Sequence, residues 1–288
     1  LNLSGDASGK LRIALVGANT GKTIYEGEVT LEQSGRDYFW VREDGERVPL
    51  RGDVRFYGVD FSYVPEKPVL RDLSLTIPAG EITVIVGRSG CGKSTLLKLL
   101  AGTEMPDTGT IRIPEGWHSA MLSPDPYVIT WTSVQRNVAM ACGVGKTPEE
   151  RYERASEFVR LVGLEDYADL TPAELSTGMK QRLGLARVLA GQAELLLMDE
   201  PFASLDFLTR AELQSQLLAI QEKLPRTIVL VTHQLEEALL LGRRIIVMHP
   251  DSTICEFDLT DLPYPRDLDD PTLRRLKEAI TDQCRYTA

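Results

Sequence analysis

A glycine-rich loop limits what this chain can fold into more than any other feature of its sequence. It follows a run at 82–86 that has no alternation of polar and apolar residues, and it reads Gly87-Arg88-Ser89-Gly90-Cys91-Gly92-Lys93-Ser94, which fits G-x-x-x-x-G-K-[ST]. The run predicts a strand buried on both faces of a parallel sheet, and the residues after the loop predict a helix at 94–100. Glycines that turn successive N–H groups inward at a helix N-terminus make a phosphate site. We therefore predict that Lys93 reaches the terminal phosphates of a nucleotide and that the Ser94 hydroxyl binds Mg²⁺.

A similar stretch nearer the start of the chain leads to a different prediction. It reads Gly17-Ala18-Asn19-Thr20-Gly21-Lys22-Thr23, with one residue fewer between the glycines than a phosphate loop requires. We expect a turn there. An ordinary turn is also the alternative for residues 87–94, but the strand before that loop and the helix after it argue against this alternative.

The order of the apolar patterns predicts an α/β fold with a parallel sheet. Strands are expected at 54–63, 73–77, 82–86, 195–198, 227–232 and 244–248, and helices at 94–100, 147–162, 177–190, 208–223, 235–241 and 272–282. Thr147 and Glu150 have the spacing of a capping box around Pro148. Residues 1–55 have short strand patterns at 10–16, 23–31, 37–41 and 47–50, separated by Gly and Asp, which predict a small β appendage.

Polar residues follow two of the expected strands directly. Asp199 and Glu200 come after the strand at 195–198, and His233 comes after the strand at 227–232. Open α/β sheets hold their ligands at the carboxyl ends of the strands, which is also where the phosphate loop lies. Asp199 is therefore an expected Mg²⁺ ligand, and Glu200 is expected to face an attacking water. Taken alone, Asp199 and Glu200 fit a solvated strand end equally well, and a lone histidine at a strand end is more often structural than catalytic. Their agreement with the loop favours a site.

The third candidate element is the start of the helix expected at 177–190. Ser176 suits the N-cap position, and Gly178 permits the close approach of a ligand to the first turn. A capped amphipathic helix without a ligand is the alternative, and it would be preferred if the element stood alone. Residues 204–206 follow the two carboxylates closely and belong to the same region of the chain.

Charge and composition exclude two classes of protein. A formal net charge of −10 argues against a surface that follows a nucleic-acid backbone, so no nucleic-acid partner is expected. The apolar runs are of strand length, so the chain is not expected to cross a bilayer. The four cysteines, Cys91, Cys142, Cys255 and Cys284, form no C-x-x-C pair, and residues 1–9 lack the pattern of a secretory signal. The cytoplasm is the expected compartment.

Taken together, these motifs resemble the ATP-binding subunits of ABC transporters over roughly residues 54–250. The phosphate loop, the signature Leu175–Met179, Asp199-Glu200, Ser204–Asp206 and His233 occur in the order of that family. The stretches 201–206, 231–238 and Leu262-Pro263-Tyr264-Pro265-Arg266 are most similar to the nitrate, sulfonate and taurine importer branch. The resemblance implies an ATP-binding domain at 54–250, whereas the β-rich extension expected at 1–53 from its strand patterns matches nothing in the family. The domain would contain an antiparallel β subdomain and a helical subdomain at about 120–190, and an acidic C-terminal tail would follow at 251–288.

The resemblance also implies a site and its partners. Two ATP molecules with Mg²⁺ would lie between two paired ATPase subunits, as in a homodimer, each phosphate loop facing the signature of the other subunit. Glu200 and His233 would be catalytic, and Ser94 and Asp199 would bind the metal. The implied nucleotide-binding residues are Tyr63, which would stack on adenine, Gly87, Arg88, Ser89, Gly90, Cys91, Gly92, Lys93, Ser94, Thr95, Ser176, Thr177, Gly178 and Met179. Transmembrane permease subunits would hold the protein at the cytoplasmic face of the plasma membrane, and an external substrate-binding protein would act indirectly.

Two positions depart from the pattern of the family. Alignment on Trp131, Val134 and Asn137 places Pro124 where the family has a glutamine that contacts Mg²⁺ and the attacking water. Proline offers neither a polar side chain nor an N–H group. Either a water or the adjacent Ser123 replaces that contact, or the coupling between ATP and the permease is altered. In the signature, Thr177 stands where glycine is usual, which restricts the backbone and adds a hydroxyl.

The sequence leaves two functions open. The first is an ATPase that energises an importer, for which the segment at 125–140 would receive the permease. The second is a regulatory or interaction module in which ATP-driven dimerisation is the output and turnover is low; Pro124 and the unassigned extension at 1–53 favour it. The sequence of this chain does not specify the transported molecule, since the permease and an external binding protein select it.

Overall fold

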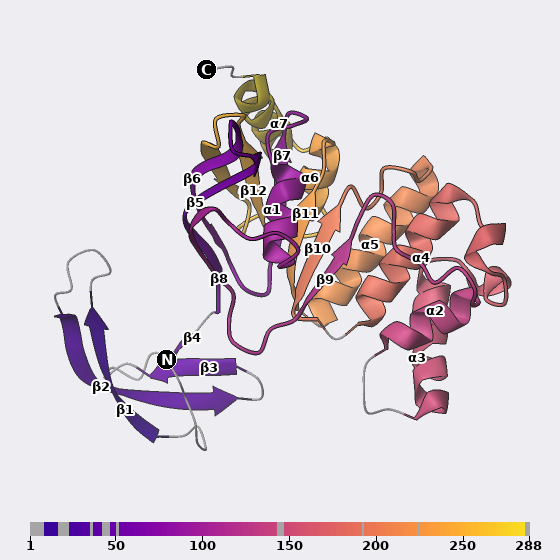
Figure 1. The fold of residues 1–288 in the computed structure, drawn as a ribbon, viewed down its shortest axis with the longest axis horizontal. Helices are drawn as coiled ribbons and strands as arrows, with labels where there is room; N and C mark the ends of the chain where they lie inside the picture. The colour runs from indigo at the N-terminus through magenta and orange to yellow at the C-terminus, as the bar shows by residue number, and fades with distance from the viewer. Residues whose placement is uncertain are drawn as a thin grey trace. The chain divides into compact units, whose positions relative to one another are not determined.

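The computed structural model describes residues 9–16, 23–34, 37–41, 47–49, 52–142, 147–191, 193–223 and 225–285. Contacts divide the chain into two units, Leu1–Gly52 and Asp53–Ala288. The first unit contains the strands β1 (Gly9–Val16), β2 (Thr23–Ser34), β3 (Asp37–Val41) and β4 (Arg47–Pro49), which pair antiparallel in that order (Figure 1). The glycine-lysine stretch at 17–22 lies outside the described residues.

A six-stranded sheet forms the centre of the second unit, in the order β13-β12-β7-β11-β10-β9. Its strands are β7 (Ile82–Gly87), β9 (Ser119–Leu122), β10 (Leu195–Asp199), β11 (Thr227–Val231), β12 (Arg244–Met248) and β13 (Ile254–Asp258). All neighbours pair parallel except β12 and β13. Strand β12 pairs with one edge of β7 and β11 pairs with the other, so the strand order reverses at β7. Open α/β sheets bind ligands at the carboxyl ends of the strands where the order reverses. The predicted α/β class is confirmed.

Alternate residues of the parallel strands enter two separate cores. Leu195, Leu197, Val229 and Val231 face the helix α1 (Lys93–Leu100) and the sheet of β5, β6 and β8. Leu196, Met198, Ile228 and Leu230 face the other helices. Both faces of each strand are buried, which explains why the sequence of these strands shows no polar alternation. The strand ends are therefore the places where polar side chains meet solvent.

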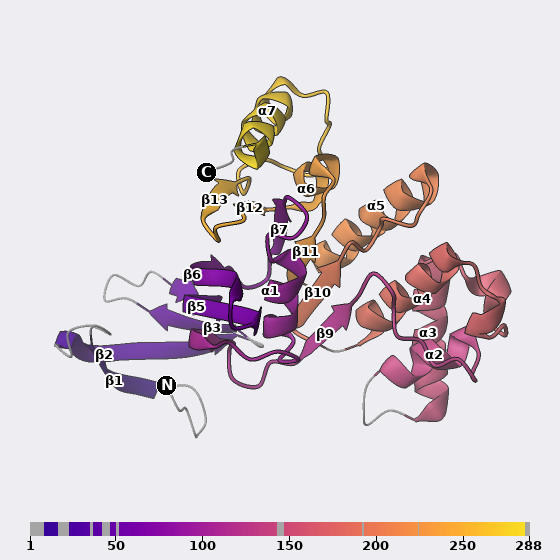
Figure 2. The ribbon, with the colours of Figure 1, turned by 45° about the horizontal axis from the view of Figure 1, so that its top comes forward.

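A three-stranded antiparallel sheet and a group of helices flank this centre (Figures 1 and 2). The sheet contains β5 (Val54–Val64), β6 (Lys67–Ile77) and β8 (Thr108–Arg112), with β5 in the middle. The helices α2 (Val134–Ala141), α3 (Pro148–Leu161) and α4 (Thr177–Ala190) pack on one another. The capping box predicted for Thr147 and Glu150 is present at the start of α3. Helix α5 (Phe207–Lys223) follows β10.

The residues after 250 contribute to the folded unit. Strand β13 extends the central sheet, and α7 (Pro271–Arg285) packs on α6 (Leu235–Leu241) with Leu273 and Ile280 buried. Between them, Tyr264 and Arg266 donate hydrogen bonds to the carbonyls that end α6, those of Leu239, Leu241 and Gly242, at 2.6–2.7 Å. Helix ends have such unpaired carbonyls, so the segment 262–266 caps α6. The acidic side chains at 258, 261, 267, 269 and 270 are exposed.

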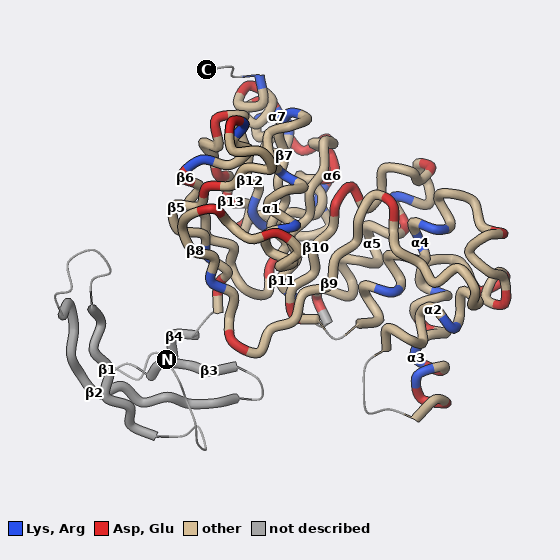
Figure 3. Tube along the Cα trace, viewed as in Figure 1, with Lys and Arg blue, Asp and Glu red and all other residues tan. Residues whose placement is uncertain are grey.

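Charges of both signs are interspersed along the second unit (Figure 3). Among the helices in the described parts of the chain, none combines the length and the apolar character that a membrane span needs.

Candidate functional site

The glycine-rich loop connects β7 to α1, as predicted. Gly92 takes φ 101° immediately before the helix, a conformation that side chains with a Cβ rarely adopt. A Cβ at Gly92 would also lie 2.7 Å from Leu70 Cδ2 on β6. The loop is therefore held tightly between the helix and the neighbouring sheet, and this position requires glycine.

Lys93 lies at the centre of this loop. Its side chain is largely buried, and its Nζ donates to the carbonyls of Gly87 at 2.9 Å and Arg88 at 3.0 Å. Cys91 is buried in the core beneath the loop, and this burial raises the pKa of its thiol. Arg88 is exposed. Only carbonyl oxygens and the Cys91 sulfur lie within hydrogen-bonding distance of the Lys93 ammonium among the described residues, which leaves its charge available to an anion.

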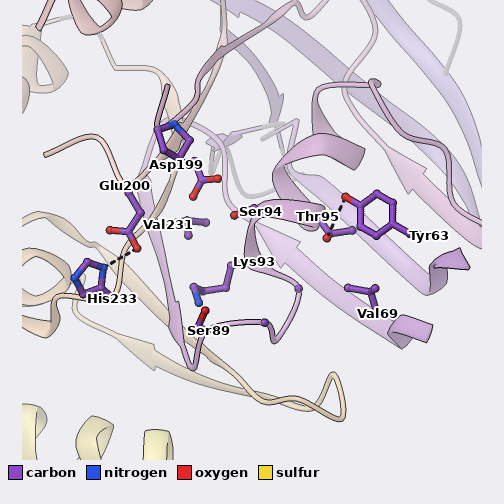
Figure 4. A pocket seen from close by; sticks show the side chains of 13 residues that line it. Tyr63, Val69, Ser89, Lys93, Ser94, Thr95, Asp199, Glu200, Val231 and His233 are labelled. Carbon is purple, nitrogen blue, oxygen red and sulfur yellow. Dashed lines mark hydrogen bonds and ion pairs between the residues drawn. The ribbon is translucent and has the colours of Figure 1, made fainter. Parts of the chain in front are cut away.

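The loop forms one wall of a cavity of about 500 Å³ (Figure 4). The other walls come from the end of β5, from residue 124 and from the carboxyl ends of β10 and β11. The lining residues are Tyr63, Val69, Ser89, Gly90, Gly92, Lys93, Ser94, Thr95, Pro124, Asp199, Glu200, Val231 and His233. Most of the predicted site residues therefore meet in one place, although they are far apart in the sequence.

Asp199 and Ser94 form the part of the cavity that fits a divalent cation. Asp199 ends β10, is 5% exposed and is hydrogen-bonded to Ser94. Burial raises the pKa of Asp199, while Ser94 and Lys93 oppose this shift. A carboxylate and a hydroxyl are the hard oxygen donors that Mg²⁺ takes, and Mg²⁺ commonly combines few protein ligands with water and phosphate oxygens. The donor set therefore suits Mg²⁺ held beside a phosphate.

Glu200 and His233 form a hydrogen-bonded pair at the edge of the cavity, with 2.8 Å between Glu200 Oε1 and His233 Nδ1 (Figure 4). The Glu200 backbone has φ 50°, and its N–H donates to the Val231 carbonyl. A left-handed conformation costs a residue other than glycine about 1–2 kcal/mol, and the hydrogen bond to β11 offsets part of this cost. The turn directs the Glu200 carboxylate across the end of β11 toward His233.

Tyr63 lies on the wall opposite the carboxylates. Its side chain is half exposed, and its ring makes an edge contact with Phe61 at 4.9 Å between centroids. The hydroxyl accepts hydrogen bonds from Lys98 Nζ at 3.2 Å and Thr95 Oγ1 at 3.4 Å. Tyr63 is therefore not a core residue.

The signature residues do not line this cavity. Ser176 is the N-cap of α4 and accepts a hydrogen bond from the Met179 N–H, as predicted, and Ser176 and Thr177 are both exposed. A Cβ at Gly178 would lie 3.2 Å from the carbonyl oxygen of Ser204. The signature turn thus packs closely against the segment 204–206, and within one chain it is separate from the phosphate loop.

Sequence reasoning did not find the polar residues behind Glu200. Thr232 and Glu237 are buried, and Arg210 reaches them from α5. Burial raises the pKa of Glu237, against the opposing effects of Thr232 and Arg210. In the sequence, the only sign of this group is that Glu237 directly precedes the apolar residues 238–241.

Comparison with known proteins agrees with this geometry. Residues 70–203 match the ABC transporter family. The aliphatic sulfonates import ATP-binding protein SsuB 1 of Agrobacterium fabrum is 40% identical over 219 residues, which cover 76% of this chain and 79% of that protein. The taurine import ATP-binding protein TauB of Pseudomonas aeruginosa is 43% identical over 191 residues, 63% of this chain and 72% of that protein.

A solved structure provides an independent comparison. The dimeric post-hydrolysis state of the ATP-binding cassette MJ0796 bound to ADP and Pi has a TM-score of 0.66 and 28% sequence identity, and the match covers 72% of this chain and 98% of that chain. The identity and the coverage of the curated relatives, together with the shared fold, show that this chain belongs to the ABC transporter family.

Proposed function

We propose that this chain hydrolyses ATP to drive a membrane importer of a small anion, such as nitrate, a sulfonate or taurine. The observation that supports the proposal most is that the phosphate loop, Asp199, Glu200 and His233 line one cavity. Two curated relatives are named for the import of aliphatic sulfonates and of taurine. The shared chemical class of these compounds favours an anion over other cargo.

In the proposed reaction, Lys93 and the N–H groups at the start of α1 neutralise the terminal phosphates of ATP. When bound by Ser94 and Asp199, Mg²⁺ would supply further positive charge to these phosphates. Glu200 orients the attacking water and takes its proton, and His233 holds the Glu200 carboxylate at 2.8 Å and contacts the γ-phosphate. Tyr63 stacks on the adenine ring from the opposite wall.

We also propose that two chains pair and that each completes the site of the other. Ser176, Thr177, Gly178 and Met179 would offer N–H donors and the dipole of α4 to the γ-phosphate held by the other chain. The exposure of Ser176 and Thr177 supports this arrangement, as does the dimeric structure of the related cassette.

Permease subunits would bind the segment at 125–140 at the cytoplasmic face of the inner membrane. An external substrate-binding protein would deliver the anion to the permease.

A regulatory module with low turnover is the second candidate function, and Pro124 favours it. Pro124 lines the cavity and brings no polar side chain to it. Phosphate release by this chain, measured alone and with its permease in proteoliposomes, separates the two functions. An importer ATPase should accelerate when substrate and binding protein are added. A rate that stays low under every condition would favour the regulatory module.

Pro124→Gln is expected to raise MgATP turnover roughly tenfold and to lower the Mg²⁺ concentration needed for half the maximal rate. The glutamine would place an amide at the cavity wall, and one hydrogen bond to a charged group is typically worth about 1.5–3 kcal/mol. Steady-state phosphate release over a Mg²⁺ series measures both effects. Pro126→Gln is the matched control, since Pro126 lies against Gly184 of α4 and does not line the cavity. Equal rates for both variants and the wild type would contradict the prediction.

Asp199→Asn is expected to raise the melting temperature of the nucleotide-free protein at pH 7 and to abolish the dependence of ATP binding on Mg²⁺. Since the pKa of Asp199 is raised in the folded chain, folding favours the protonated form. This stabilisation is present below the unfolded pKa, near 4, and is lost as the pH rises through the folded pKa. At pH 7 the buried carboxylate is therefore unfavourable, and a neutral amide removes that cost.

Thermal unfolding between pH 4 and pH 7 measures this effect, and the gain in melting temperature should shrink toward pH 4. Asp258→Asn is the control and should change the melting temperature at pH 7 in the opposite direction. The reason is that hydrogen bonds from Thr260 lower the pKa of Asp258, so its charged form is favoured by folding. A wild type that is more stable than Asp199→Asn at pH 7 would refute the argument.

A further inference from the structure

A buried polar group lies directly behind the Glu200–His233 pair and has no part in the proposed reaction. Thr232 follows β11 and Glu237 lies in α6, and their side chains are inaccessible or nearly so, at 0% and 2% exposure. The Thr232 hydroxyl lies 2.7 Å from Glu237 Oε2 and 3.5 Å from Glu200 Oε2. One hydroxyl therefore stands between two carboxylates.

The Thr232 hydroxyl has a single proton to donate. Its oxygen also accepts a hydrogen bond from the Gln234 N–H at 3.1 Å. The shorter contact assigns the hydroxyl proton to Glu237, since 2.7 Å is optimal for O–H···O and 3.5 Å is outside the normal range. Glu200 Oε1 is in hydrogen-bond contact with His233. Glu200 Oε2 is therefore the carboxylate oxygen that can interact with another partner.

Arg210 makes an ion-pair contact with the Glu237 carboxylate that is too long for a hydrogen bond. Arg210 Nε faces Glu237 Oε1 at 3.9 Å, on the side opposite Thr232. The other nitrogens of the same guanidinium donate to Gln234 Oε1 at 2.7 Å and to the Leu205 carbonyl at 2.9 Å. Arg210 thus joins the segment 204–206, the start of α6 and Glu237 in one network.

We propose that Glu237 is a positioning residue for Glu200: by accepting the Thr232 proton, it keeps Glu200 Oε2 free for the attacking water. This inference rests on the proposed role of Glu200 in ATP hydrolysis. Arg210 lies beside the Glu237 carboxylate and also donates to the Leu205 carbonyl. A shift of the segment 204–206 would therefore change the position of Arg210 relative to Glu237. Glu237 acts through Thr232 and does not touch the substrate.

Glu237→Gln tests the proposal because the positive charge of Arg210 favours one orientation of the amide. The amide oxygen faces Arg210, since two donors cannot face each other there, and the NH₂ group therefore points to Thr232. Thr232 then accepts two hydrogen bonds and must donate its own proton to Glu200 Oε2. We expect kcat to fall about three- to tenfold, a part of the roughly 10²–10⁴ contributed by a general base, while KM for ATP changes less than about twofold.

Removing the Thr232 hydroxyl should reverse this loss. Thr232→Val alone is expected to keep kcat within about twofold of the wild type, because the hydroxyl of the wild type is not donated to Glu200. In the double variant with Glu237→Gln, Thr232→Val should restore kcat to at least half of the wild-type value. A Glu237 that merely stabilised the fold would give a double variant at least as impaired as Glu237→Gln. That result, or a wild-type rate for Glu237→Gln, would overturn the proposal.

Two further measurements make the test independent of folding and of the proposed function. If Glu237→Gln does not fold, Glu237→Asp keeps the charge but withdraws the carboxylate from Thr232, and the same rescue by Thr232→Val is expected. In nucleotide-free protein with ¹³C-labelled glutamate, the carboxylate signal of Glu200, assigned by its loss in Glu200→Gln, should shift in Glu237→Gln and return in the double variant. An unshifted signal would overturn the proposal. Wild-type turnover in Glu200→Gln would instead refute the proposed role of Glu200 in hydrolysis.

Discussion

Glu200→Gln is expected to give a protein that binds MgATP with nearly wild-type affinity and hydrolyses it roughly 10²–10⁴ times more slowly. Glutamine keeps the size of the side chain and its contact with His233, but it cannot take a proton from water. Because Asp199, Ser94 and Lys93 remain, the groups proposed to hold the nucleotide and the metal are unchanged. Equilibrium ATP binding and single-turnover phosphate release measure the two effects separately.

The chain offers a matched control for this substitution. Glu194 precedes β10 and pairs with His118 at 3.7 Å, so it forms a second Glu–His pair at the opposite end of the same strand. Glu194→Gln should hydrolyse ATP at the wild-type rate. Turnover of Glu200→Gln close to that of Glu194→Gln would show that Glu200 is not the base.

Lys93→Met is expected to weaken ATP binding by about 10- to 150-fold. A hydrogen bond between charged groups is worth about 1.5–3 kcal/mol, and each 1.36 kcal/mol corresponds to a factor of ten. Methionine fills a similar volume beside the loop carbonyls but brings no charge to the cavity. Titration with a fluorescent ATP analogue measures the dissociation constant.

Lys277→Met serves as the control for the loss of one positive charge. Lys277 is on α7, where it pairs with Glu236 on the surface, and it does not line the cavity. Its affinity for ATP should equal that of the wild type. If Lys93→Met binds ATP as tightly as Lys277→Met, the phosphate loop is not the nucleotide site.

The sequence predicted the strands of the sheet centre well because their signal is local. The strands β7, β10, β11 and β12 are apolar on both faces, and helices α4 and α6 have the predicted bounds. The missed elements are β8, β9, α2 and β13, of which the three strands are short and none is fully buried. The three strands depend on pairing with distant segments, which no local pattern encodes. Helix α2 begins at the N-cap Ser133, a local signal that the prediction did not use.

The candidate site was predictable to the extent that its residues follow strands. Asp199, Glu200 and His233 could be placed at one sheet edge because parallel strands share their carboxyl ends, and the structure brings them together with Lys93. Their chemical roles stay predictions. The contacts of Thr232 with Glu237, and of Glu237 with Arg210, could not be foreseen, because they depend on how α5 and α6 pack against β11. The separation of Ser176 from the cavity depends likewise on the packing of α4.

The parallel register of the sheet has a consequence for how the length of such a chain can vary. Asp199 lies beside Val231, and Val231 beside Ile85, so the last residues of β10 and β11 lie in one row with a residue near the end of β7. Deleting or inserting a single residue within β10 would exchange its two faces and put Glu200 or Met198, respectively, in the place of Asp199 at the row. Related proteins should therefore tolerate insertions and deletions in the connections that precede these strands. Insertions and deletions inside the strands should abolish function.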